Sequence, residues 1–144
     1  MKLYTHLTGL LAVTAMLFSC NPQPAGSEEE NSQSNSAKAV QLKQGLRWEA
    51  NPETSEGIYK MMEQVQQART LPESSRCSIL KDSLQNHFKY IVEKCTMTGE
   101  AHEELHNYIV PLRDLIGKLE DNSHCQATIG EIERHLQTYN HYFQ

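Results

Sequence analysis

The chain has 144 residues and a formal net charge of −5 at pH 7. After a leader and a linker are set aside, this length fits one small domain with a single core. No basic patch with interleaved aromatic residues occurs, so a nucleic acid is not an expected partner.

Residues 1–20 have the pattern of a secretory signal. Met1 and Lys2 precede an apolar run from Leu7 to Phe18, and the run ends in Leu17-Phe18-Ser19-Cys20. A run of about a dozen residues is too short for a membrane-spanning helix, which needs about twenty. A charged start, a short apolar stretch and a small residue before the cut predict a segment that is processed.

The end of this segment resembles the lipobox of bacterial lipoproteins. The resemblance implies that residues 1–19 are removed and that Cys20 becomes the lipidated first residue. The bland alternative is a cleaved signal that leaves Cys20 as an ordinary thiol. Asn21 is not the aspartate that retains some lipoproteins at the inner membrane. We therefore expect an anchor in the outer membrane, with the protein periplasmic or surface-exposed.

Residues 20–36 predict a flexible linker. Apart from its cysteine the segment has no large apolar residue, so it cannot offset the entropy cost of ordering. Glu28, Glu29 and Glu30 loosely resemble acidic surface-export signals of some lipoproteins, and a solvated acidic linker explains them equally well.

Residues 37–144 predict the folded domain. The stretch from Val40 to Ala50 predicts either a short helix or an extended arm. Asn51 and Pro52 are typical of a helix start, with Asn as N-cap and Pro at the first helical position. This first helix is expected to end before Leu71-Pro72.

Three further helices follow in the sequence. The second is expected from Ser74 or Ser75 to about Cys95. The third is expected after a tight turn, with Thr98 as its cap and Pro111 causing a kink. The fourth begins with Ser123 and Gln126 in a capping-box pattern and runs to Phe143.

Each of these helices carries an apolar stripe at helical spacing. The stripe residues are Ile58, Met61, Met62, Val65 and Ala68; Leu80, Leu84, Phe88, Ile91 and Cys95; His102, Leu105, Ile109, Leu112, Ile116 and Leu119; and Cys125, Ile129, Ile132, Leu136, Tyr139 and Phe143. Four amphipathic helices joined by short turns predict an all-α fold, an antiparallel up-down four-helix bundle.

Three cysteines remain if Cys20 is lipidated. In an up-down bundle, Cys77 and Cys125 both lie near the start of their helices and at the same end. Cys95 lies about 27 Å away at the other end, at 1.5 Å per residue. A disulfide needs Cα atoms within about 7 Å, so Cys77 and Cys125 form the one plausible pair. Because the second and fourth helices are diagonal in the simplest bundle, whether the pair is bridged stays open.

The densest group of chemically active residues surrounds the turn between the second and third helices. His102 and His106 are four residues apart and share one helix face. Cys95 and Met97 approach from the preceding helix and turn. Thiolate, thioether and imidazole ligands suit Cu(I) or Zn(II). The sequence therefore predicts a metal site at Cys95, Met97, His102 and His106.

Other interpretations of these residues stay open. Cys95 and His102 fall on apolar stripes, so they are also explained as core residues at one end of the bundle. The letters His102-Glu103-Glu104-Leu105-His106 match the zinc-peptidase pattern, in which the glutamate is a general base. That activity needs a third ligand and a substrate cleft. A weaker alternative pairs Met61 or Met62 with His135 around a haem.

Two segments resemble those of a group of small, uncharacterised lipoproteins of Gram-negative bacteria. They are residues 48–54 with Gly57-Ile58, and residues 95–102 with Leu105-His106. The resemblance implies no activity. In the expected bundle both segments lie at one end, which places Trp48 and Asn51 near Cys95, Met97 and His102.

These observations lead to two main hypotheses. The first is a membrane-tethered envelope lipoprotein whose helical domain binds Cu(I) or Zn(II). The second is a non-catalytic accessory lipoprotein that binds an envelope protein through a helical face or through the Trp48 end. We expect no enzymatic activity, with a zinc peptidase as the remaining alternative.

Overall fold

The computed structural model describes residues 38–144 except Asp121. The predicted signal, the linker and the lipidation site at Cys20 lie outside the described residues.

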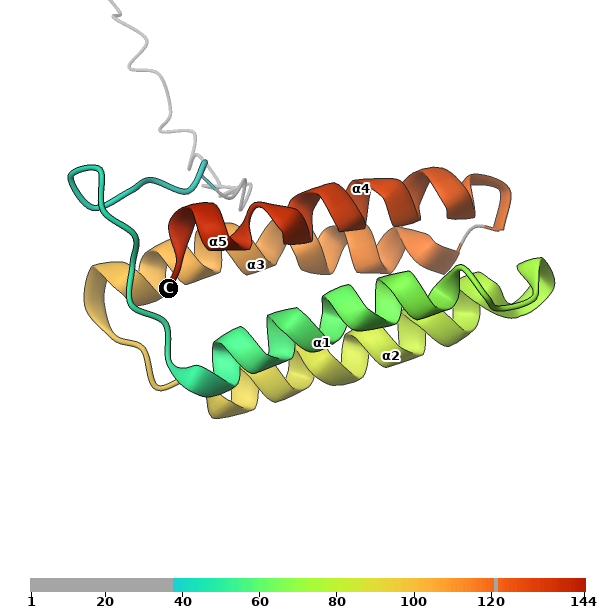
Figure 1. The fold of residues 1–144 in the computed structure, drawn as a ribbon, viewed down its shortest axis with the longest axis horizontal. Coiled ribbons are helices and arrows are strands. Elements are labelled where there is room, and N and C mark those ends of the chain that lie inside the picture. The colour runs from blue at the N-terminus through green and yellow to red at the C-terminus, as the bar shows by residue number, and fades with distance from the viewer. Residues whose placement is uncertain (1–37, 121) are drawn as a thin grey trace, which may run out of the picture. The chain divides into compact units, whose positions relative to one another are not determined.

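The described chain is all-α, as the sequence predicted, and its long helices are shown in Figure 1. The elements are α1 (Pro52–Ala68), α2 (Glu73–Lys94), α3 (Gly99–Gly117), α4 (Cys125–Gln137) and the short α5 (Tyr139–Tyr142), with 3-10 turns at Lys118–Glu120 and Asn122–His124. Within the part of the chain that the structure describes, β structure is limited to two isolated bridges.

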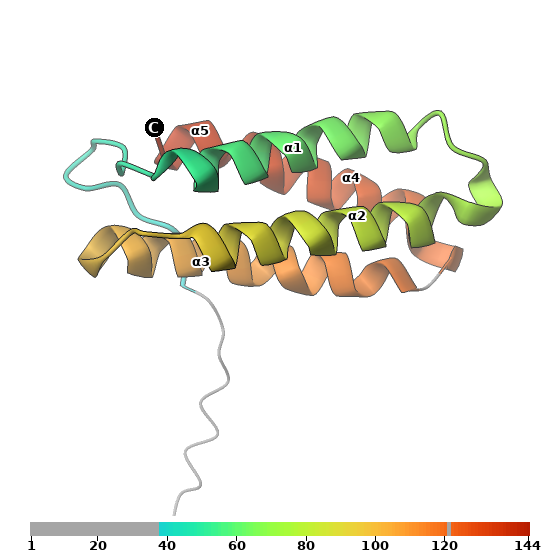
Figure 2. The same cartoon turned by 90° about the horizontal axis from the view of Figure 1, so that it is seen from below.

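The four long helices enclose one apolar core. Helix α1 packs along α2 and also contacts α4, while α3 contacts both α2 and α4. Figure 2 shows α1 and α2 side by side along their length. The predicted stripes supply most of the core; the largest fully buried side chains are Tyr108, Tyr139, Phe143, Ile58, Met61, Leu80, Leu84, Ile91, Leu105, Leu112, Leu119 and Ile132.

The helix boundaries agree with the sequence more closely than the caps do. Helix α1 starts at Pro52, and α3 starts after Thr98, but neither Asn51 nor Thr98 makes a side-chain capping bond. The predicted capping box at Ser123 is wrong. A 3-10 turn over Asn122–His124 delays the start of α4, so His124 occupies the N-cap position.

The last predicted helix is divided at Thr138. The hydroxyl of Tyr108 on α3 donates to the carbonyl oxygens of His135 (3.0 Å) and Leu136 (3.3 Å), and Thr138 Oγ1 also donates to His135 O (2.7 Å). The carbonyl oxygens of His135 and Leu136, at the end of α4, therefore accept hydrogen bonds from side chains outside the helix. The apolar stripe nevertheless continues into α5, since Tyr139 and Phe143 are fully buried.

The segment before α1 is an extended arm, which settles the choice between arm and helix. Lys43 and Leu46 close a tight turn through two backbone hydrogen bonds of 2.9 and 3.0 Å. Gln44 and Gly45 at its tip have φ of 54° and 86°. Trp48 then pairs with the C-terminal segment, since its N–H donates to Tyr142 O at 2.8 Å and its carbonyl accepts from Gln144 N at 2.9 Å. The arm therefore closes over one end of the core.

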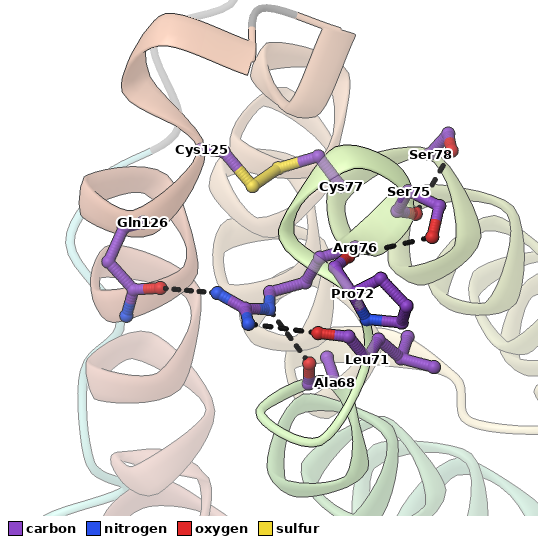
Figure 3. The surroundings of a disulfide bond; sticks show 9 residues. All are labelled: Ala68, Leu71, Pro72, Ser75, Arg76, Cys77, Ser78, Cys125 and Gln126. Carbon is purple, nitrogen blue, oxygen red and sulfur yellow. Dashed lines mark hydrogen bonds between the residues drawn. A yellow bond between two sulfur atoms is a disulfide. The ribbon is translucent and has the colours of Figure 1, made fainter.

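A disulfide joins α2 to the start of α4. Cys77 and Cys125 are bridged with Cα atoms 5.9 Å apart, and the Cys77 side chain is fully buried. Figure 3 shows Arg76 beside this bridge. Its guanidinium donates to Ala68 O (3.0 Å), at the end of α1, and to Leu71 O (2.9 Å), in the connection between α1 and α2. The bridge and Arg76 together tie three helices at this end.

None of the described helices combines the length and the apolar character that a membrane span requires.

Candidate functional site

The chain between α2 and α3 forms the centre of the candidate site. Helix α2 ends at Lys94, and Cys95 follows in an extended conformation. Residues 95–98 carry no helix, and Gly99, with φ of 59°, turns the chain into α3. A side-chain-bearing residue rarely adopts that φ, so glycine suits this position. This short turn brings the start of α3 back beside Cys95.

Cys95, His102 and His106 form a continuous series of polar contacts. Cys95 Sγ lies 3.6 Å from His102 Nδ1, and His102 Nε2 lies 3.1 Å from His106 Nε2. The two imidazole rings are 4.6 Å apart and inclined by 63°. Cys95 and His102 are half-buried, whereas His106 is exposed. The series therefore leads from a half-buried thiol to the surface.

The four expected ligands do not converge on one point. His102 faces Cys95 with one ring nitrogen and His106 with the other, so a single ion cannot use both contacts. Met97 is half-buried and packs against the apolar core. In residues 38–120 and 122–144, no three side chains among His, Cys, Asp and Glu are arranged to hold a metal. The arrangement offers a sulfur–nitrogen pair, Cys95 with His102.

Cys95 is the free thiol of the described chain. The other two described cysteines are consumed by the bridge between Cys77 and Cys125. A thiol beside an imidazole can act as a soft ligand when it is deprotonated. Cys95 is therefore the one described cysteine that is available for this chemistry.

The extended arm borders the same end of the domain. Asn51 Nδ2 donates to Lys94 O at 3.1 Å, and Gln41 N donates to Glu104 Oε2 at 2.8 Å. The first contact joins the start of α1 to the end of α2, and the second joins the arm to the first turns of α3. The expectation that Asn51 lies near Cys95 agrees with the contact to Lys94.

The Trp48 side chain is buried and is not exposed to a partner. It is 7% exposed, its Nε1 donates to Gln41 O at 2.6 Å, and Lys43 Nζ lies 5.6 Å from the ring centroid. A partner could not use the indole itself without displacing the arm. Trp48 also borders a groove of about 390 Å³ with Glu100 and Glu103. Glu103, the base of the peptidase pattern, is thus accompanied there by further acidic residues.

From the sequence, His135 was considered only as a possible haem partner, and its pairing with the buried Tyr108 was not predicted. The rings of Tyr108 and His135 are 4.5 Å apart, and His135 Nε2 lies 2.9 Å from Tyr108 O. Burial lowers the pKa of His135, although the contact to the Tyr108 carbonyl acts in the opposite direction. Burial also raises the pKa of Tyr139 to about 12. Tyr108 and His135 sit one turn from stripe residues, which is the signal that could have identified them.

The haem alternative finds no support in this arrangement. His135 Nε2 is engaged with the carbonyl of Tyr108, Met61 is fully buried in the core, and Met62 is half-buried against the same core. Packing explains all three residues.

Comparisons of the chain with protein-family models, with curated proteins and with solved structures found no match.

Proposed function

We propose that the protein is a membrane-tethered lipoprotein of the bacterial cell envelope whose helical domain binds one Cu(I) ion through Cys95 and His102. The domain is an antiparallel up-down four-helix bundle, and Cys20 carries the lipid anchor. The pattern of residues 1–20 supports the anchor. The short connection at Leu71-Pro72 supports antiparallel α1 and α2, and the bridge supports the direction of α4, because it joins the starts of α2 and α4, which share one end in an up-down bundle.

The proposal depends on the separation of Cys95 Sγ and His102 Nδ1, which is 3.6 Å. A metal bonded to sulfur at about 2.3 Å and to imidazole nitrogen at about 2.0 Å, with an angle of about 110–120°, separates those atoms by about 3.5–3.8 Å. The pair is therefore already spaced as two adjacent ligands of one three- or four-coordinate ion.

The number of donors favours Cu(I) over Zn(II). A structural zinc site uses four protein ligands in a tetrahedron. Cys95 and His102 supply two, and Met97, in the same connection, supplies a third if its thioether turns outward. Cu(I) prefers soft thiolate and thioether ligands and accepts this smaller set.

His106 has a supporting role in this proposal. Metal-binding histidines usually donate their second ring N–H to a partner that fixes the ring orientation. His102 Nε2 lies 3.1 Å from His106 Nε2, which suits this role. His106 then orients His102 and fixes its tautomer, rather than binding the ion itself.

The test is a Cu(I) titration against a chromophoric competing chelator under reducing-agent-free, anaerobic conditions. The protein takes up one ion, and Cys95→Ser or His102→Ala abolishes uptake. His106→Ala weakens affinity about 10–100-fold, the usual cost of losing a supporting partner. His141→Ala, an exposed histidine of α5, serves as the control. Unchanged uptake in both Cys95→Ser and His102→Ala would refute the proposal.

An accessory lipoprotein that binds an envelope protein is the second candidate. The exposed apolar side chains favour it, above all Leu46 (70%) on the arm and Val92 (55%) on α2. Under this alternative, Leu46→Asn abolishes binding to the partner while Cu(I) uptake is absent from the unaltered protein. Cu(I) uptake by the unaltered protein distinguishes the two.

A further inference from the structure

A groove lies between α2 and α3, away from the thiol and histidine series. Its volume is about 560 Å³, and the residues along it come from the second half of each helix. Ligand pockets for small organic molecules have volumes of about 300–1,000 Å³. The groove therefore has the size of a small-molecule site.

The floor of the groove is apolar and open. Phe88 belongs to the same stripe as Leu84 and Ile91, which are fully buried, yet Phe88 is only half-buried and lines the groove. Gly117 lies on the opposite side, where an added Cβ would meet no atom within 4 Å. The exposed part of the Phe88 ring is therefore the main apolar surface of the groove, since Ile116 is only 3% exposed.

The rim carries one cation from each helix. Lys89 of α2 lies 3.7 Å from Glu93, and Arg113 of α3 lies 2.8 Å from its neighbour Asp114. These lysine and arginine side chains are 73% and 59% exposed, and exposed ion pairs of this kind contribute little. Both cations are therefore able to turn toward an anionic group, and Asp114 is the one acid among the described residues that line the groove.

We propose that this groove binds one long-chain carboxylate, with its hydrocarbon chain against Phe88 and Ile116 and its head group between Lys89 and Arg113. An α-helix with its side chains is about 10–12 Å across and rises about 5.4 Å per turn, so a single turn of about 420–610 Å³ would already fill the groove. One turn of a partner helix provides much less than the area of about 800 Å² per partner that stable protein interfaces bury. A single acyl chain with an anionic head group matches both the volume of the groove and the charge of its rim.

The rim charges also select a free acid over the acyl chains of the lipid anchor. Acyl groups attached to Cys20 end in amide or ester bonds and carry no negative charge. Lys89 and Arg113 would then have no anion to bind. The proposal accordingly commits to a free carboxylate.

Calorimetric titration of the full chain with Cys20→Ser, which carries no acyl group, tests the site. The probes are tetradecanoate, dodecanoate and methyl tetradecanoate, each below its aggregation concentration. We expect one tetradecanoate per chain, about tenfold tighter binding than the methyl ester, and weaker binding of dodecanoate by up to about fourfold per methylene removed.

Two pairs of variants test separately how the apolar floor and the charged rim of the groove contribute to binding. Gly117→Leu fills the groove and lowers affinity for acid and ester by about tenfold or more, while Gly130→Leu, also at an open glycine but on α4, does not. Lys89→Gln with Arg113→Gln removes the preference for acid over ester, while Lys60→Gln on α1 keeps it. No binding by the starting protein, equal binding of acid and ester, or equal losses in variants and controls would overturn the proposal. If Gly117→Leu fails to fold, the rim variants still decide the result.

Discussion

Gly57 of α1 lies directly against Ile91 of α2, and a Cβ atom at position 57 would overlap Ile91 Cγ1 and lie 2.9 Å from its Cδ1. In an open helix interior, replacing glycine by alanine stabilises by about 0.5–1 kcal/mol. At position 57 the substitution is expected to destabilise instead, because the methyl group must displace the fully buried side chain of Ile91. We expect Gly57→Ala to destabilise the domain by about 1–3 kcal/mol, measured by urea denaturation.

Gly130→Ala is the matched control for that substitution. Gly130 lies inside α4, where an added Cβ meets no atom within 4 Å. We expect a gain of about 0.5–1 kcal/mol. A stabilising Gly57→Ala would contradict the close packing of α1 on α2.

The disulfide constrains a long loop, since Cys77 and Cys125 are 48 residues apart in sequence. Reduction is expected to destabilise the domain by about 2–4 kcal/mol, mainly through greater entropy of the unfolded chain. The measurement compares denaturation of oxidised and reduced protein in a Cys95→Ala background. Intact mass after alkylation verifies the redox state, and an unchanged midpoint after complete reduction would disprove the effect.

Arg76 and Arg69 form a second matched pair. Arg76 makes two part-buried hydrogen bonds, one to the last residue of α1 and one to the connection between α1 and α2, whereas the Arg69 side chain is 61% exposed in its ion pair with Glu133. We expect Arg76→Met to cost about 1.5–3 kcal/mol and Arg69→Met to cost about 1 kcal/mol or less. Thermal denaturation of both variants checks this, and an equal cost would show that Arg76 does not hold the helix ends together.

His135 makes stability depend on pH. Burial lowers its pKa in the folded state, so the unfolded chain, with a histidine pKa of about 6.5, binds more protons just below that value. The stability contribution is complete above about pH 6.5 and is lost as the pH falls through the lowered value.

The measurement for His135 is the unfolding free energy between pH 7.5 and 5. The unaltered protein should lose more stability on acidification than His135→Gln, which cannot titrate. His141→Gln, at an exposed position, should behave like the unaltered protein. Identical slopes for His135→Gln and the unaltered protein would exclude the buried ring as the source.

Apolar periodicity predicted the long helices well, because each helix buries one stripe in a shared core. The stripe that ends in Ile132 and Leu136 continues to Phe143 even though α4 stops at Gln137. Two donors lie at that end: Thr138, which is local, and the hydroxyl of Tyr108 on another helix. Local sequence contains the first of these contacts but gives no sign of the second.

The candidate site was predicted only in part. Spacing along one helix is enough to bring His102 and His106 together, and the turn length brings Cys95 beside them. The direction of each ring nitrogen depends on the side-chain rotamers. The sequence therefore could not show that His102 contacts Cys95 through one ring nitrogen and His106 through the other. The groove between α2 and α3 depends on how side chains of two helices meet in space, which periodicity along one helix does not predict.

X-ray absorption at the copper edge of the Cu(I)-loaded protein tests the central claim most directly. We expect one sulfur or two at about 2.3 Å and one imidazole nitrogen at about 2.0 Å, with a sulfur lost in Cys95→Ser and the imidazole signal lost in His102→Ala. A spectrum with nitrogen and oxygen neighbours alone, unchanged by Cys95→Ser, would contradict it.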